Sequence, residues 1–132
     1  MQSIAVSNWK SFFSTGELAA LEACLAEEVI FESPVVHTPQ VGKAKTVMYL
    51  YSAQRVFYNP SFVYLREWIE PKSSVLELQT SIDGVLINAV DIITWNDDDK
   101  ITGFKVMIRP LKAIQHVHQL MMHELLKSIP PQ

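Results

Sequence analysis

The chain has 132 residues and a mass of 15.0 kDa, the size of one domain, and we expect residues 1–132 to form that domain. Hydrophobic residues make up 48% of the sequence and charged residues 19%, which excludes a disordered tail or a linker. The net charge is −3, without the basic excess typical of proteins that bind nucleic acid. No apolar run approaches the roughly 20 residues that span a bilayer. We therefore expect neither nucleic acid nor a membrane as a partner.

The spacing of cysteine, glycine and histidine argues against a disulfide, a cofactor or a metal site. Cys24 is the single cysteine, and the four glycines are scattered without forming a phosphate-binding motif. His116, His118 and His123 are separated by two, five and seven residues, whereas metal ligands on a helix are spaced by three or four. Residues 1–4 lack a basic segment followed by an apolar one, so we expect no secretory signal and a cytoplasmic location.

The first half of the chain predicts three helices and one short strand. Trp9, Phe12 and Phe13 lie at helical spacing, and a Ser-Thr-Gly run then breaks the pattern. A second helix is indicated by leucines that recur at helical spacing. Its leucines are Leu18, Leu21 and Leu25, and it is followed by a strand over 29–32, a loop over 33–42 with two prolines, and a third helix over 43–57.

The second half predicts four antiparallel strands and a last helix. We expect the strands over 62–69, 75–82, 85–95 and 101–109, and a helix that Pro110 opens and that runs to residue 126. The Asp-Gly pair at 83–84 is a strong signal for a two-residue hairpin. Helices that are segregated from a meander of strands indicate the α+β class rather than alternating α/β.

Alternation along the predicted strands places one carboxylate, Asp91, among apolar side chains. Successive side chains on a strand point to opposite faces of the sheet. The inward rows are expected to be Leu76 and Leu78, then Ile87, Ala89, Asp91 and Ile93, then Phe104, Val106 and Ile108. Burial disfavours the charged form of a carboxyl group, so the pKa of Asp91 should rise. Such an acid is either functional or a structural aspartate bonded to a neighbour.

The opposite face of the predicted sheet mixes large aliphatic side chains with polar ones. Its aliphatic members are Val90, Ile92 and Met107, and its polar members are Glu77, Gln79, Asn88, Lys105 and Arg109. This mixture is typical of an interface between copies of one chain, and an ordinary solvated face is the alternative. We expect a homodimer that pairs through the outer sheet face.

The order and spacing of several segments resemble the nuclear transport factor 2-like (NTF2-like) superfamily, in particular its SnoaL-like bacterial members. The segments are Trp9 with 13–18, 29–34 with Gly42 eight residues after the proline, 90–95, and 100–104. The resemblance implies a cone-shaped, curved antiparallel sheet wrapped around the N-terminal helices, a fold also called cystatin-like, with a pocket at the open end. Members often pair through the outer sheet face. Because the fold hosts isomerases, epoxide hydrolases, cyclases, dehydratases and plain binding modules, it does not settle function.

Ketosteroid isomerase, a member of this superfamily, offers a comparison position by position. Its general-base aspartate falls on Ser33, its oxyanion-hole tyrosine on Trp9, and a supporting tyrosine on Leu50. Only its second oxyanion-hole acid has a counterpart here, which is Asp91. A serine does not replace a carboxylate base without an activating partner, so the resemblance predicts that this chain lacks that isomerase activity.

Two hypotheses for function remain, and they leave open whether the protein is an enzyme. In the first, a SnoaL-like protein binds a small, largely apolar molecule in the cone pocket, with Asp91 as polar anchor or as the acid/base group of an isomerase, cyclase or hydrolase type reaction. In the second, the chain is a non-catalytic dimeric binding or interaction module. An open cavity at Asp91 favours the first, and a cone filled by Trp9, Phe13 and Leu50 favours the second.

The residues expected to bind the ligand combine the inward rows with the mouth of the cone. Ser33 has the alternative of bonding the local backbone, His37 that of packing on a helix, and Trp9 that of simple core packing. The full set is Trp9, Ser33, His37, Leu50, Ile93, Phe104 and Ile108.

Overall fold

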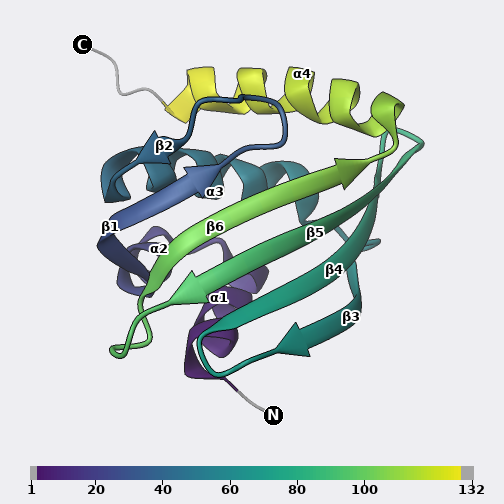
Figure 1. Ribbon diagram of the computed structural model, residues 1–132. Helices are drawn as coiled ribbons and strands as arrows, with labels where there is room; N and C mark the ends of the chain where they lie inside the picture. The colour runs from purple at the N-terminus through teal and green to yellow at the C-terminus, as the bar shows by residue number, and fades with distance from the viewer. Residues whose placement is uncertain (1–2, 129–132) are drawn as a thin grey trace.

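The computed structural model describes residues 3–128, which form a six-stranded sheet and four helices of the α+β class (Figure 1). The elements are α1 (Ile4–Thr15), α2 (Leu18–Cys24), β1 (Leu25–Glu32), β2 (Gln40–Val41), α3 (Lys43–Phe57), β3 (Val63–Ile69), β4 (Ser73–Ile82), β5 (Val85–Trp95), β6 (Ile101–Arg109) and α4 (Leu111–Ser128). Met1 and Gln2, part of the segment in which we expect no secretory signal, lie outside the described residues.

The helix α1 has a defined cap at each end. The Ser3 hydroxyl accepts a hydrogen bond from the backbone N–H of Val6 at 3.3 Å, which satisfies one of the free donors of the first turn. At the other end Gly16 takes a left-handed conformation with φ 73°, and its N–H bonds the carbonyl of Phe12. Between these caps the aromatic residues of the helix are buried against the sheet, as their spacing predicts. They are Trp9, Phe12 and Phe13.

The strand β1 is longer than expected and pairs differently from the other long strands. Leu25 belongs to this strand and not to the preceding helix, because it is buried and pairs with Ile101 of β6. The helical spacing of the three leucines did not reveal the boundary between α2 and β1. Leu25 fits that spacing although it is an inward-facing strand residue. The β1–β6 pairing is parallel, and Gln40–Val41, expected within a loop, forms a short strand against β1.

The four strands of the second half form the predicted antiparallel meander. β3, β4, β5 and β6 are neighbours in that order, and the hairpin between β4 and β5 has φ 51° at Asp83 and φ 78° at Gly84. Positive φ at both turn residues is the geometry that an Asp-Gly hairpin favours. The inward rows are also confirmed, because Leu76, Leu78, Ile87, Ala89, Asp91, Ile93 and Phe104 are buried and Val106 and Ile108 are half-buried.

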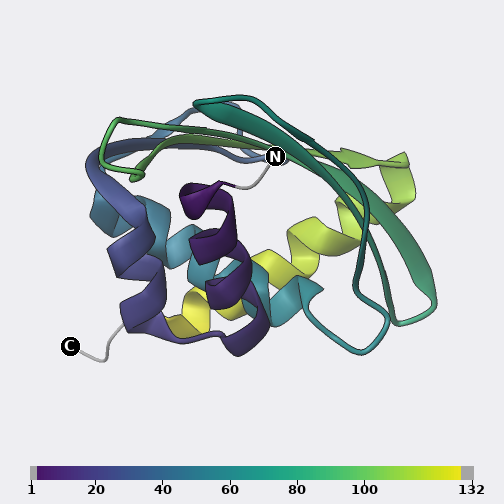
Figure 2. The same ribbon diagram turned by 90° about the horizontal axis from the view of Figure 1, so that it is seen from below.

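The sheet curves over the helices, as Figure 2 shows, with α1 beneath its concave face. The last helix, α4, packs against α3, β5 and β6, so it covers one end of the concave face. None of the helices within residues 3–128 combines the length and the apolar character that crossing a membrane requires.

The α1 cap leads to a prediction for Gly16. A Cβ atom placed there would lie 2.9 Å from Oε1 of Gln54, whose amide nitrogen donates to the Phe13 carbonyl at 3.0 Å. We expect Gly16→Ala to lower the free energy of unfolding by about 2 kcal/mol, about half from the left-handed backbone and half from the displaced hydrogen bond. Urea denaturation measures this loss.

Gly84→Ala is the matched control, because Gly84 has a similar φ of 78° and no atom within 4 Å of the added Cβ. It should lose only the backbone part, about 1 kcal/mol. Equal losses in the two variants would contradict the role given to Gln54.

Candidate functional site

A cavity of about 30 Å³, which we call the inner chamber, lies between α1, α3 and the concave face of the sheet. A single water molecule needs roughly 10–15 Å³ measured in this way, so the inner chamber has room for one or two waters. Asp91 is the one ionisable residue among its lining residues, and the others are apolar or aromatic. The lining residues are Trp9, Phe13, Leu50, Ala53, Phe57, Leu78, Ala89, Asp91, Phe104 and Val106.

Asp91 projects from the middle of β5, where Leu76 and Val106 lie opposite it on the two neighbouring strands. The residue is only 6% exposed, and among residues 3–128 no cation or hydrogen-bond donor engages its carboxyl group. Burial alone raises the pKa of Asp91 to about 7. A large share of the molecules therefore carries a neutral, proton-donating Asp91 at physiological pH.

Trp9 lines the same chamber and carries a buried donor. Its side chain is 1% exposed, and the indole Nε1 has no hydrogen-bond partner among the described residues. The phenol of Tyr64 is a neighbour of both groups: burial and the Asp91 charge raise the Tyr64 pKa, and the Trp9 indole acts in the opposite direction. The Trp9–Tyr64 geometry nevertheless falls short of a hydrogen bond. Two residues with polar groups unpaired among residues 3–128, Trp9 and Asp91, thus line the inner chamber.

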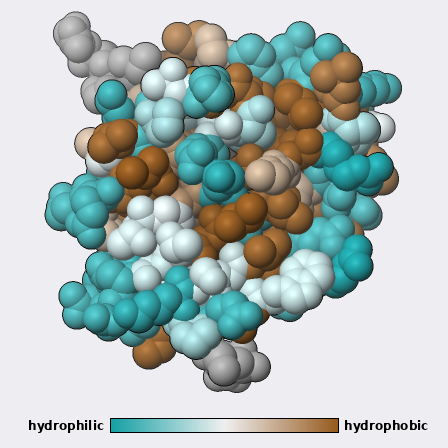
Figure 3. Space-filling model, in the orientation of Figure 1, coloured by the Kyte–Doolittle hydropathy of each residue, from teal (hydrophilic) through white to brown (hydrophobic). Residues whose placement is uncertain are grey.

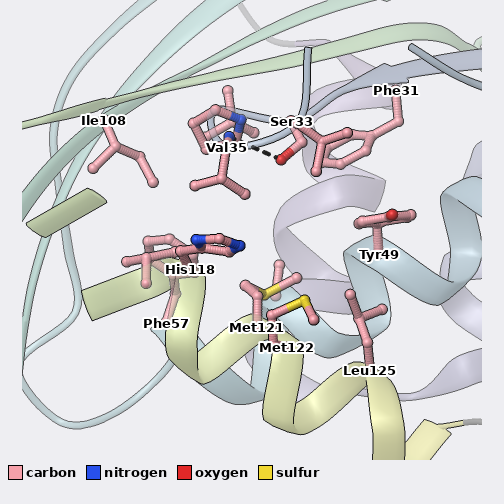
Figure 4. A pocket seen from close by; sticks show the side chains of 15 residues that line it. Phe31, Ser33, Val35, Tyr49, Phe57, Ile108, His118, Met121, Met122 and Leu125 are labelled. Atoms are coloured by element: carbon pink, nitrogen blue, oxygen red, sulfur yellow. Dashed lines mark hydrogen bonds between the residues drawn. The ribbon is translucent and has the colours of Figure 1, made fainter. Parts of the chain in front are cut away.

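A second cavity, the outer chamber, has a volume of about 70 Å³ and lies against α4 (Figure 4). Its walls come from the end of β1 and the segment after it, from α3, from β6 and from α4. Ala53, Phe57 and Val106 line both chambers, so the two are neighbours that share a wall of three side chains. Both are mostly apolar, and Asp91 lines the inner one.

Three polar side chains from three different elements reach the outer chamber: Ser33, Tyr49 and His118. Ser33 Oγ accepts a hydrogen bond from the Val35 N–H at 3.1 Å, as Figure 4 shows. This is the local backbone bond that is common for a serine at the end of a strand. In Figure 4 the His118 ring points from α4 toward the segment that holds Val35.

The structure brings most of the expected ligand-binding residues together. Trp9, Leu50 and Phe104 line the inner chamber with Asp91, and Ser33 and Ile108 line the outer one. Two expected residues line neither chamber. His37 is exposed in the loop before β2, and Ile93 is fully buried in the core.

The sequence did not single out the α3 and α4 residues of the outer chamber. Tyr49, His118, Met121, Met122 and Leu125 belong to this group. The spacing of His118, Met122 and Leu125 by four and three residues is the signal for a shared face of α4. Within residues 3–128, no group of three or more His, Cys, Asp or Glu side chains is placed to hold a metal ion.

The outer face of the sheet carries a hydrophobic patch, visible in brown across the centre of Figure 3. Leu86 and Met107 are both more than half exposed there, and Leu65 is 45% exposed. Polar groups lie among them, since Glu77 receives hydrogen bonds from Arg66 at 2.8 Å and from Asn88 at 3.0 Å. The mixed composition predicted for this face is present.

Comparison with known proteins finds no matching family model and no matching curated protein, but it finds solved structures that resemble the whole chain. A steroid Δ-isomerase from Pseudomonas aeruginosa is 27% identical, with a TM-score of 0.86 over 93% of this chain and 90% of that one. An uncharacterised protein with a cystatin-like fold from Silicibacter pomeroyi is 25% identical, with a TM-score of 0.87 over 96% and 89%.

A third structure extends the likeness at the level of the fold. An NTF2-like protein of unknown function from Mesorhizobium loti is 16% identical, with a TM-score of 0.69 over 80% of this chain and 88% of that chain. The curved sheet over helices and these likenesses agree with the predicted cystatin-like fold, while assignment to the SnoaL-like branch stays a prediction. The chain has the fold of the nuclear transport factor 2-like superfamily.

Proposed function

We propose that this protein binds a small, largely apolar molecule in the two chambers, with an oxygen of that molecule at Asp91. The observation that carries the proposal is that Trp9, whose indole N–H has no partner among the described residues, lines the same cavity as the buried, protonatable Asp91 carboxyl. Buried polar groups are nearly always hydrogen-bonded, and a group left unpaired costs about 1–3 kcal/mol. An acceptor oxygen from a ligand, or a water that the ligand displaces, satisfies both donors.

A carbonyl compound fits these donors best. A carbonyl oxygen has two acceptor sites and no proton, so it receives both the N–H of Trp9 and the O–H of protonated Asp91. A carboxylate is unsuited to the inner chamber, because it would meet the Asp91 carboxyl in a desolvated space. Hydrogen bonds from two donors also draw electron density toward that oxygen, which is the polarisation that acid/base chemistry on a carbonyl compound requires. The proposal therefore includes proton donation by Asp91.

The chamber volumes limit the size of the ligand. A dry cavity of about 150 Å³ holds a benzene molecule, whereas the chambers here measure about 70 and 30 Å³. A steroid, the substrate class named for the Pseudomonas aeruginosa neighbour, is too large for this space as it stands. We therefore propose a ligand much smaller than a steroid.

A non-catalytic dimeric module is the second candidate, and the narrowness of the inner chamber favours it. Trp9, Phe13 and Leu50 are all buried and occupy much of the cone. In this case the inner chamber holds only water, and the functional surface is the outer sheet face. We propose the homodimer through that face under either candidate function.

The ligand proposal is tested with methyl propyl ketone as the probe, by NMR of the three tryptophan indole N–H groups. We expect the ketone to shift the Trp9 signal, because its oxygen accepts from that N–H. The Trp95 indole already donates to the Pro71 carbonyl at 3.1 Å and should not move. Asp91→Leu should weaken binding about tenfold, the size of one strong hydrogen bond, and the exposed Asp98→Leu should not. A ketone that leaves the Trp9 signal unmoved would sink the proposal.

The raised Asp91 pKa predicts a pH dependence of stability. The pKa is about 7 in the folded chain against the ordinary 3.8, so the folded state holds the proton more tightly. Ionisation at higher pH therefore penalises folding, and the contribution of Asp91 to stability falls as pH rises from about 4 to 7. Relative to the wild type, Asp91→Asn should gain about 2–3 kcal/mol of unfolding free energy between pH 5 and pH 8. Urea titrations at both pH values measure the gain, and a pH-independent difference would show that Asp91 ionises normally.

The homodimer leads to a prediction for Val90, which lies beside Met107 on the outer sheet face. An arginine at Val90 would place a charge in the centre of the patch, so Val90→Arg should convert the dimer to a monomer at micromolar concentration. Leu126→Arg is the matched control, because Leu126 is exposed on α4 away from the sheet. Sedimentation velocity reports the mass of each. If the wild type sediments as a monomer, the interface is wrong.

A further inference from the structure

The outer chamber contains hydrogen-bond donors and no acidic side chain among its lining residues. Ser33 Oγ already accepts the Val35 N–H, so its own proton remains to be donated. Among residues 3–128 no hydrogen bond engages the Tyr49 hydroxyl or the His118 ring, which leaves their donors available as well. Three side chains that can donate hydrogen bonds, one from each of three segments, therefore line an otherwise apolar space.

His118 is the one side chain of the outer chamber that can carry a positive charge. Imidazole titrates close to neutral pH, and in its charged form both ring nitrogens donate. The residue lines the chamber and is exposed to solvent. An anionic group at this place can stay partly hydrated while it accepts hydrogen bonds from His118 and the two hydroxyls.

We propose that the ligand is a short oxo acid, with its ketone oxygen at Asp91 and Trp9 and its carboxylate at His118, Tyr49 and Ser33. This inference rests on the proposed function and names the class of ligand for the same site. The two chambers impose the orientation, because only the inner one excludes an anion and only the outer one offers a cation. The apolar side chains that the chambers share, Ala53, Phe57 and Val106, match the methylene groups between the two ends.

The experiment compares three probes that differ at one end only: levulinate, methyl propyl ketone and valerate. Levulinate has both groups, the ketone lacks the carboxylate, and valerate lacks the carbonyl. The two next longer homologues of levulinate cover different spacings between the groups. Affinities are taken from NMR titrations at pH 6, with the Trp9 indole signal as the local reporter. We expect one of the oxo acids to bind at least tenfold more tightly than the ketone, as charge-assisted hydrogen bonds usually contribute.

His118→Gln should remove the advantage of the oxo acid over the ketone, measured as the ratio of the two affinities in the same variant. His123→Gln is the matched control, since His123 lies on the same helix and does not line the chamber. It should leave both affinities unchanged.

The other possible results of this experiment contradict either the carboxylate end of the proposal or the whole of it. If the ketone binds and no oxo acid binds better, the carboxylate end is wrong and the proposed function stands. The same holds if the advantage survives His118→Gln. If neither compound moves the Trp9 signal, the proposed function and this inference both fall.

Discussion

The burial of the Asp91 carboxyl on the concave face of the sheet constrains the rest of the molecule. The residue sits between Leu76 and Val106 on the neighbouring strands, and within residues 3–128 it has no cation beside it. A strand has a side-chain period of two, so turning Asp91 outward would also expose Ile87 and Ile93. Both are fully buried, and their burial holds the carboxyl in place. The Asp91 carboxyl therefore has a fixed position in the interior. What changes with pH is whether it carries a proton.

The alternation that fixes Asp91 is also the reason why the sequence predicted it. Strand periodicity and the Asp-Gly turn are local signals, and the four strands of the meander lie where these signals place them. The start of β1 at Leu25 depends on its partner Ile101, which is 76 residues away, and no local pattern contains that pairing. The same reason explains why the parallel β1–β6 contact and the short strand β2 were missed.

The sequence did not predict the outer chamber, for a related reason. Tyr49 and His118 come from α3 and α4, and helical periodicity tells which side of each helix packs without telling what it faces. The histidines of α4 attracted attention only as metal ligands, for which their spacing is wrong. His118 gains its position from the way α4 lies over the end of the sheet, and that docking depends on α3, β5 and β6 together.

The polar groups of the two chambers differ in their access to solvent, which would not be so in a single pocket. In the inner chamber desolvation keeps Asp91 mostly neutral below pH 7, so that end donates hydrogen bonds but carries no charge. In the outer chamber His118 is exposed to solvent, so a charged ligand group beside it stays in contact with water. A neutral oxygen and an anion on one ligand would thus be sorted to opposite ends by solvent access alone. This sorting requires no movement of the sheet, because α1 and α4 reach its concave side at different places.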